Sequence, residues 1–291
     1  MTDIEEIIKT ALVAIYSENI LSETLYLKGG QALRVAHNLR SRFSGDTDFS
    51  IKESVGEGEA FFRLLRDTLY NFYYSNGLFL FDFQFTRRPK FRDETVPDFW
   101  GGWQVEFKLI EKEKMTLNLE DLRRQAIVPK GMESSKIKLD VSEYEYCGSI
   151  EKIKVGFVSV KTYSKVLIIL EKIRAIAQQH PKYSYKGHSS NRARDYYDIE
   201  RVYQKIIEEN KKEKFLLEAA THLKFVFDAK KVSLELLDGI FDDSFVALQK
   251  KSWASVKATV FGKVDDFEYY NETLKNIIRE IKKSLPKIKL F

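Results

Sequence analysis

The sequence predicts an α+β protein in which an N-terminal domain with a mixed sheet precedes a C-terminal, all-helical domain. Two observations support this class. Up to about residue 160, segments that alternate apolar and polar residues, as strands do, occur among helical segments. Beyond about Thr162, only the helical spacing of apolar residues recurs. We therefore place the two domains at residues 1–160 and 161–291.

The predicted elements of the N-terminal domain follow from these two periodicities. Apolar residues recur at helical spacing in three segments, which predicts helices at 3–17, 31–38 and 59–74. Alternation or a short apolar run predicts strands at 25–27, 46–51, 78–85, 103–110 and 136–141. In the last of these strands the apolar face is complete without Asp140, so this aspartate projects from the opposite face.

The predicted C-terminal domain consists of helices alone. Helical periodicity extends over 163–179, 194–209, 214–227, 233–250 and 265–283. The final stretch, 271–291, carries six basic residues against two acidic ones, which accounts for most of the formal net charge of +5. Such an end suits an anionic partner, and it is equally consistent with a solvated helix face.

The composition is that of a folded protein from a reducing compartment. With 291 residues, 44% hydrophobic and 31% charged, the chain can bury a sizeable core in each domain. Cys147 is the only cysteine, so no disulfide can form within the chain. No apolar run approaches the roughly 18–20 residues of a membrane span, and the acidic opening does not resemble a signal peptide. We therefore expect a cytoplasmic protein without a membrane segment.

Two glycines lie between the first predicted strand and the helix that follows it. Gly29 and Gly30 allow unusual backbone dihedrals and a close approach of the backbone to a ligand. The start of the following helix would offer free N–H groups and a positive dipole end to a phosphate. A plain packing turn has the same pattern, so this turn predicts a phosphate site only together with other residues.

Two aspartates alternate along the second predicted strand. In extended backbone, residues two apart project from the same face, so Asp46 and Asp48 would lie about 6–7 Å apart. Adjacent carboxylates raise each other's pKa unless a cation lies between them, and Mg²⁺ prefers oxygen ligands. Alone, the pair is also consistent with a solvated edge strand. If the strand that carries Asp140 lies beside this one, three carboxylates converge, enough for two magnesium ions, or manganese in their place, on a nucleoside triphosphate.

In their order and spacing these residues resemble the polymerase-beta-like nucleotidyltransferases, and within them the AbiEii/AbiGii group of toxin-type enzymes. The resemblance spans about residues 25–205. The segments that carry it are Lys28-Gly29-Gly30, Arg42-x-Ser44-x-Asp46-x-Asp48, the strand with Asp140, Glu171-Lys172-Ile-Arg-Ala and Arg192-Ala-Arg-Asp195-x-x-Asp198. The chain departs from the group at Gln31, where Thr or Ser is common, so one hydroxyl contact to phosphate is missing.

The resemblance implies different functions for the two predicted domains. Residues 1–160 would form the catalytic nucleotidyltransferase domain, and residues 161–291 a helical domain that completes the nucleotide site and binds the acceptor. The implied metal ligands are Asp46, Asp48 and Asp140. The implied catalytic residues are these three together with Lys172 and Asp195. The implied nucleotide-binding residues are Gly29, Gly30, Arg42, Ser44, Lys172 and Asp198.

Plainer roles are open for several of these side chains. Lys172 could be an ordinary surface lysine instead of a triphosphate ligand. Arg42 could form an ion pair with Asp46 instead of contacting a phosphate. Asp195 and Asp198 could orient Lys172, or they could be acids at a helix start that favour the helix dipole.

The expected activity is the transfer of NMP from an NTP, with Mg²⁺, to an acceptor hydroxyl. The resemblance implies a toxin that acts on tRNA 3′ ends and is neutralised by a separate antitoxin protein. The basic C-terminal stretch and the loop 87–92, with Phe91 and Trp100 nearby, would receive the RNA, although that loop also suits a solvated hairpin. Two other hypotheses are transfer of a nucleotidyl or phosphoryl group to a protein, either the antitoxin or the chain itself, and a non-catalytic module that binds nucleotides or RNA.

Overall fold

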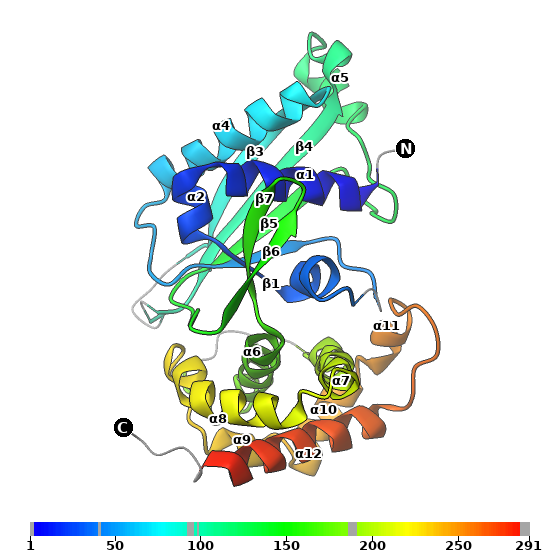
Figure 1. The fold of residues 1–291 in the computed structure, drawn as a ribbon. Coiled ribbons are helices and arrows are strands. Elements are labelled where there is room, and N and C mark those ends of the chain that lie inside the picture. The colour runs from blue at the N-terminus through cyan, green and yellow to red at the C-terminus, as the bar shows by residue number, and fades with distance from the viewer. Residues whose placement is uncertain (1–2, 40–41, 92–95, 98, 186–190, 286–291) are drawn as a thin grey trace.

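The computed structural model describes residues 3–39, 42–91, 96–97, 99–185 and 191–285. Within these residues, a half that contains a sheet is stacked on a half that consists of helices (Figure 1). The predicted α+β class is therefore confirmed. The chain passes from the sheet to the helices at Ser164. The division into domains 1–160 and 161–291 stays a prediction.

A mixed sheet of seven strands forms the framework of the first half in the described chain. The strands are β1 Tyr26–Lys28, β2 Thr47–Ser50, β3 Leu78–Arg88, β4 Gly102–Glu111, β5 Ile137–Ser142, β6 Ile150–Val155 and β7 Val158–Tyr163. Their order across the sheet is β3-β4-β5-β2-β1-β7-β6. The pairs β2–β5 and β1–β7 are parallel, whereas the remaining pairs are antiparallel. The strand with Asp140 thus lies directly beside the strand with Asp48, as predicted.

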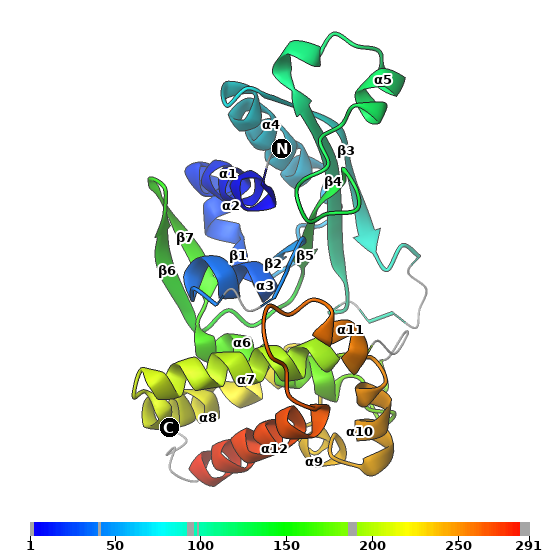
Figure 2. The same ribbon diagram turned by 90° about the vertical axis from the view of Figure 1, so that its right-hand side faces the viewer.

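Helices cover one face of this sheet, as Figure 2 shows. The helix α1 Ile4–Ser17 packs on β6 and β7, and α4 Glu59–Ser75 packs on α1 and β3. On β4, Trp103 and Phe107 contact Phe62 and Tyr73 of α4, so the alternate residue Gln104 projects from the other face. Short helices complete this half, namely α2 Asn19–Thr24, α3 Gly29–Gln31, the π-helix η1 Ala32–Ala36, the 3₁₀ helix η2 Lys112–Lys114 and α5 Leu119–Arg124.

The second half is built around α6, a helix with apolar residues on nearly every side. Its helices are α6 Lys165–Ala177, α7 Ala193–Glu208, α8 Lys212–Asp228, α9 Leu236–Gly239, α10 Asp243–Lys250, α11 Trp253–Lys257 and α12 Phe267–Ser284. Ser164 caps the start of α6 by accepting a hydrogen bond from the Leu167 N–H. Helix α6 contacts β7, α7, α8 and α9 and is buried along its length. None of the helices among the described residues has the length and apolar character needed to cross a lipid bilayer.

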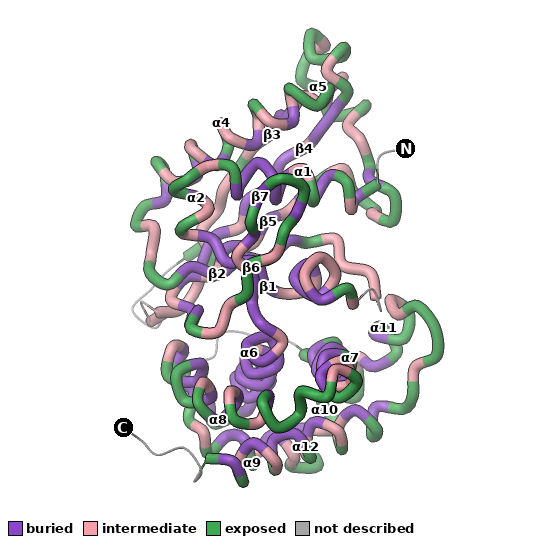
Figure 3. Tube along the Cα trace, in the orientation of Figure 1, coloured by how far each residue is buried: buried purple, intermediate pink, exposed green. Residues whose placement is uncertain are grey.

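The larger of two apolar clusters among the described residues continues from one half into the other. It includes residues of α1, the central strands, α6, α7 and α12. In Figure 3 the buried parts of the trace form a column from α1 through the sheet to α6 and α7. Because the two halves share this core, their relative position is held by apolar packing and not by a linker.

The structure differs from the sequence prediction in several places. The short helices α2, α5 and α11 are absent from the prediction. The hairpin of β6 and β7 is absent from the prediction, since β6 is an edge strand in which three of six residues are exposed and burial does not alternate clearly. The predicted helix 233–250 is divided into α9 and α10. There Ile240 is buried and Gly239 lies so close to His180 that a Cβ would meet its Nε2 at 2.7 Å. Finally, Arg87 and Arg88 belong to β3 and not to a loop.

Two leucine substitutions test the role of α6 in this core. Leu170 on α6 is fully buried, whereas Leu217 on α8 is 55% exposed. We expect Leu170→Ala to lower the free energy of unfolding by about 2–5 kcal/mol, because it removes apolar contacts and leaves a cavity. Leu217→Ala should change it by less than about 0.5 kcal/mol. Urea unfolding measures both values, and equal effects of the two substitutions would contradict this account of the core.

Candidate active site

Four polar side chains form one row across the centre of the sheet. In the strand register, Lys28 of β1 is opposite Asp48 of β2, Asp48 is opposite Asp140 of β5, and Asp140 is opposite Gln104 of β4. Paired residues of adjacent strands project from the same face, so all four side chains point away from α1 and α4. Gln104 Nε2 donates a hydrogen bond of 3.1 Å to Asp140 Oδ1. The expected meeting of the Asp48 and Asp140 strands is therefore present.

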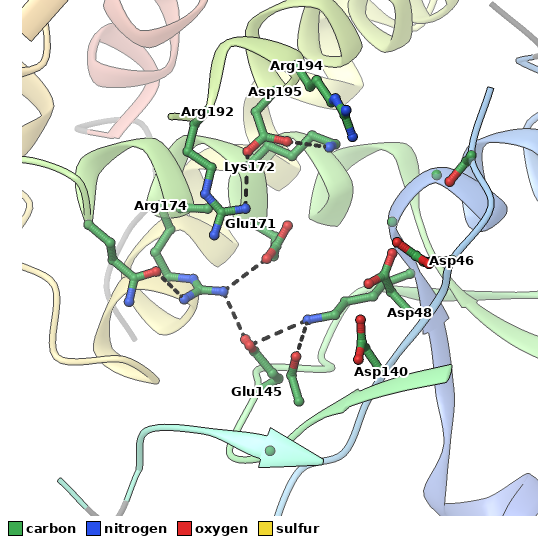
Figure 4. Close-up of a pocket in the computed structure, with 18 of the residues that line it drawn as sticks. Asp46, Asp48, Asp140, Glu145, Glu171, Lys172, Arg174, Arg192, Arg194 and Asp195 are labelled. Carbon is green, nitrogen blue, oxygen red and sulfur yellow. Dashed lines mark hydrogen bonds and ion pairs between the residues drawn. The ribbon is translucent and has the colours of Figure 1, made fainter. Parts of the chain in front are cut away.

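Three carboxylates gather at this row. Figure 4 shows Asp46, Asp48 and Asp140 beside one another at the cavity wall. The pKa of Asp48 is raised to about 6, first by burial and then by the Asp140 and Asp46 carboxylates, against the opposing charge of Lys28. Burial and the Asp46 charge also raise the pKa of Asp140, although the hydrogen bond from Gln104 opposes the change. The arrangement places mutually repelling acids together.

The donor set of these acids suits a hard divalent cation. All three ligands would be carboxylate oxygens, which Mg²⁺ and Mn²⁺ prefer. In the part of the chain that the structure describes, no group of three or more His, Cys, Asp or Glu side chains is placed so that it could hold a metal ion as it stands. Asp46 is exposed and Asp48 and Asp140 are partly exposed, and all three line the cavity. The residues therefore fit the ion by their chemistry and by their shared face.

The glycine turn packs closely against the acidic strand. Gly29 has a φ of +65°, and a Cβ on it would meet Asp48 Oδ2 at 2.1 Å. A Cβ on Gly30 would meet Ser44 Oγ at 2.3 Å. At Gly29 both the positive φ and the contact with Asp48 favour glycine, whereas at Gly30 only the contact with Ser44 does so. Gln31 is buried and donates a hydrogen bond of 2.7 Å to the carbonyl of Ser44, so it braces the loop before Asp46.

A buried ion network joins that loop to the helical half. Asp198 of α7 accepts two hydrogen bonds of 2.7 Å from Arg42, through Nε and a terminal guanidinium nitrogen. Lys172 of α6 donates to Asp198 at 2.8 Å and to Asp195 at 2.7 Å. Burial alone would raise the pKa of Asp198, but the charges of Lys172 and Arg42 outweigh it and hold the pKa well below its usual range. We call these four residues the interdomain ion network.

The network decides between the roles that the sequence left open. Arg42 does not pair with Asp46, since its guanidinium is bound to Asp198. Lys172 is not a surface lysine, because it is 5% exposed and held by two carboxylates. Asp198 is buried between two cations and is absent from the residues that line the cavity, so its position does not support the expected contact with a nucleotide. Asp195 and Asp198 both accept hydrogen bonds from Lys172, and their role in orienting it for a nucleotide stays a prediction.

A second group of charges forms the floor of the site. Glu145 lies between Arg174, at 3.0 Å, and Lys28, at 3.6 Å, and Lys230 is 3.7 Å away. Arg174 also binds Glu171 at 3.2 Å. Burial acts to raise the pKa of Glu145, but the surrounding cations outweigh it and hold the pKa at about 2. Burial lowers the pKa of Lys230 to about 8. The floor thus carries three cations against two carboxylates.

These groups surround a cavity of about 860 Å³ between the two halves. One wall is the polar face of the sheet with the glycine turn, and the other consists of residues from α6, α7 and α11. Small-molecule sites are typically about 300–1,000 Å³, so a nucleotide fits. Among the sequence-predicted residues, the lining includes Gly29, Gly30, Arg42, Ser44, Asp46, Asp48, Asp140, Lys172 and Asp195.

Sequence reasoning missed several members of this cavity. Glu145, Arg174, Lys230 and Gln104 had no assigned role. A signal was present for Arg174: helix α6 is apolar on nearly every side, so any charge on it has to be buried and paired. Glu145 and Lys230 lie in segments without clear periodicity, and no local signal identifies them.

The two basic segments expected to receive RNA do not both border the cavity. Helix α12 packs on α7 and α8, on the side of the helical half that faces away from the sheet (Figures 1 and 2). Lys287 and Lys289 lie outside the described residues. Arg87 is held by Glu143 at 3.0 Å and by the ring of Trp103, which is a structural role. Arg92 also lies outside the described residues, and of the described part of the second segment Arg88 alone lines the cavity.

Comparison with known proteins gives one family match. The model of the family described as nucleotidyl transferase AbiEii toxin, type IV TA system, matches residues 10–277. No curated protein sequence matches the chain. Among solved structures, a candidate nucleotidyltransferase from H. pylori is similar at 18% identity and a TM-score of 0.49, with 99% of this chain and 97% of that chain covered.

Two further solved structures are similar. The protein JHP933 from Helicobacter pylori has 18% identity and a TM-score of 0.49, and the match covers 97% of this chain and 92% of that chain. An antigenic nucleotidyltransferase-like protein from Paracoccidioides brasiliensis has 15% identity and a TM-score of 0.38 over 80% of this chain and 95% of that chain. The match to the family model carries the assignment, since it covers most of the chain.

Repulsion at the acidic row should be measurable as a loss of stability. Because the pKa of Asp48 is raised on folding, its ionised form destabilises the metal-free protein above about pH 6. At pH 7.5 in EDTA, we expect Asp48→Asn to raise Tm by about 2–4 °C, the shift that roughly 1 kcal/mol produces in a protein of this size. Added Mg²⁺ should raise the Tm of the wild type but not that of the variant. A lower Tm for the variant in EDTA would contradict the proposed repulsion.

Removal of a carboxylate from the interdomain ion network should lower the free energy of unfolding. Asp198→Ala leaves Arg42 and Lys172 buried with one carboxylate fewer, so we expect a loss of about 3–5 kcal/mol in the free energy of unfolding. Asp228→Ala removes an exposed partner of Lys224 and should cost at most about 1 kcal/mol. Denaturant titration of both variants gives the comparison. A loss at Asp198 as small as that at Asp228 would show that the network contributes little.

Proposed function

Because this chain belongs to the AbiEii family of nucleotidyl transferase toxins, we propose that it transfers NMP from an NTP to an acceptor hydroxyl with the help of Mg²⁺. Membership makes the chain a nucleotidyltransferase. The cation, the acceptor and the biological role are the parts of the proposal that go beyond this. The observation that supports the proposal best is the row of Lys28, Asp48 and Asp140 on the polar face of the sheet, open to a cavity of nucleotide size.

Asp46, Asp48 and Asp140 would hold the divalent ions. When bound there, magnesium supplies charge for the phosphates and lowers the pKa of a bound hydroxyl. The raised pKa of Asp48 supports this role, since acids that repel one another gain from a cation between them. Asp140 is held in place by Gln104, and its carboxylate is the one we assign to the acceptor hydroxyl as proton acceptor.

Phosphate groups would lie between the glycine turn and the helical wall. Gly29 and Gly30 leave backbone exposed beside Asp48 and Ser44, where no Cβ fits. Lys172 uses two of its three N–H donors on Asp195 and Asp198, which leaves one for a phosphate oxygen. Arg194 lines the same cavity, and its guanidinium can bind phosphate in a bidentate manner. Asp195 acts through Lys172, so we assign it to positioning.

The family description supports the wider role. It names a toxin of a type IV toxin–antitoxin system, so we propose that this protein inhibits growth and has a cognate antitoxin. We propose a tRNA 3′ end as the acceptor, because a free terminal hydroxyl on a flexible single strand can enter the cavity between the two halves.

Loss of the acidic row should abolish transfer without loss of the fold. We expect Asp48→Ala and Asp140→Ala to reduce incorporation of label from α-labelled NTP into tRNA by about 100-fold or more, because several kcal/mol of charge stabilisation are removed. Asp67→Ala, at an exposed pair on α4, should leave the rate unchanged. Circular dichroism and Tm would establish that each variant is folded.

Three outcomes of this assay bear on the proposal. Full activity of both acidic variants would end it. Label that enters protein instead of RNA would replace the RNA acceptor by a protein one. Omission of divalent cation should reduce incorporation to background, and undiminished activity in EDTA would remove magnesium from the scheme.

A further inference from the structure

A ladder of aromatic side chains leads from the cavity to the surface. We define the aromatic ladder as Trp100, Tyr183, Tyr185 and Phe99, in order of contact. The ring centroids of Trp100 and Tyr183 are 5.9 Å apart, those of Tyr183 and Tyr185 are 5.9 Å apart, and those of Tyr185 and Phe99 are 5.2 Å apart. Trp100 lines the cavity, so the ladder begins at the site. These contacts join the β3–β4 connection to the α6–α7 connection.

The ladder is anchored at its centre and open at its outer end. Tyr183 is buried, and its hydroxyl donates a hydrogen bond of 2.8 Å to the carbonyl of Lys230. Tyr185, in contrast, is 39% exposed, and Phe99 is partly exposed. A fixed inner ring with accessible outer rings is a rigid platform, because an aromatic ring loses little freedom when a ligand stacks on it.

Cations accompany the ladder. The Lys231 ammonium lies 4.7 Å from the centroid of the Phe99 ring, and Lys182 directly precedes Tyr183. Both lysines are exposed, and neither forms an ion pair with another described residue. At the inner end, Arg88 and Arg194 line the cavity. The positive local charge therefore favours an anionic partner over an uncharged or apolar one.

From this juxtaposition we propose that the aromatic ladder binds the unpaired end of a single-stranded nucleic acid and leads its terminal hydroxyl to Asp140. The inference rests on the proposed function, in which that hydroxyl is the acceptor. A base stacks on the exposed Tyr185 ring, which meets Tyr183 and Phe99 edge-to-face, while Lys231 and Lys182 contact the phosphates. A duplex hides its base faces within its own stack, so the ladder selects a single strand.

The test uses the full chain and a fluorescein-labelled single-stranded RNA of ten nucleotides in EDTA, with fluorescence anisotropy as readout. The wild type binds this probe. Tyr185→Ala weakens binding about five-fold or more, the change expected from the loss of about 1–3 kcal/mol for one stacked base. Tyr185→Phe keeps the ring and binds within about two-fold of the wild type. Phe157→Ala, at another exposed aromatic residue, serves as the matched control and binds like the wild type.

Two further readouts separate stacking from a structural effect. Lys231→Gln should reduce the slope of log K against log salt by about 0.7, the value for one phosphate contact to a single strand. In the transfer assay, Tyr185→Ala should raise KM for the RNA acceptor and leave kcat and the KM for NTP unchanged. A DNA strand of the same sequence tests whether the sugar is read: comparable binding supports stacking, whereas loss of all binding to DNA would overturn it.

The inference and the proposed function fail in different ways. Equal binding of a blunt RNA duplex, unchanged binding by Tyr185→Ala, or absence of probe binding by the wild type would each overturn the ladder, even if NMP transfer to an acceptor is observed. Probe binding that depends on the Tyr185 ring without any transfer from an NTP would support the ladder and contradict the enzyme assignment.

Discussion

Repulsion among three carboxylates is the constraint on which the rest of this structure depends. Strand pairing places Asp48 directly beside Asp140, and Asp46 lies nearby in the bend just before β2 (Figure 4). Burial and mutual repulsion raise the pKa of Asp48 to about 6, so the folded protein holds an arrangement that opposes its own stability at neutral pH. Such an arrangement persists only where the surrounding structure outweighs it, and functional sites are where it is found.

The surroundings outweigh it through close packing and through opposite charge. The backbone at Gly29 and Gly30 touches Asp48 and Ser44, so the acidic strand and its preceding loop have little room to move apart. Gln31 of the turn binds the loop through the Ser44 carbonyl, and Arg42 of the loop is bound by Asp198 of the helical half. The shared apolar core then holds the two halves together around the cavity.

The charges on α6 show how the helical half takes part in the site. Lys172 and Arg174 are buried on a largely apolar helix, and each is held by carboxylates. Buried charges need such partners, because an unpaired charge in the interior is costly. Through Asp198, Lys172 is joined to Arg42 in the loop before Asp46. Through Glu145, Arg174 is joined to Lys28 in the floor of the site. The helix therefore connects both sides of the cavity.

The sequence by itself determined the local features of this protein. The period-two pattern placed Asp48 and Asp140 on the polar faces of their strands, and helical periodicity identified the second half; these properties depend only on neighbouring residues. Asp46, predicted to lie on the same strand as Asp48, lies instead in the bend before it. The tertiary structure decided the register that aligns Lys28, Asp48, Asp140 and Gln104, the partner of Arg42, and the roles of Glu145 and Lys230. Strand pairing and ion pairing join residues that are distant in the chain, and their energies depend on distances through space that no local pattern records.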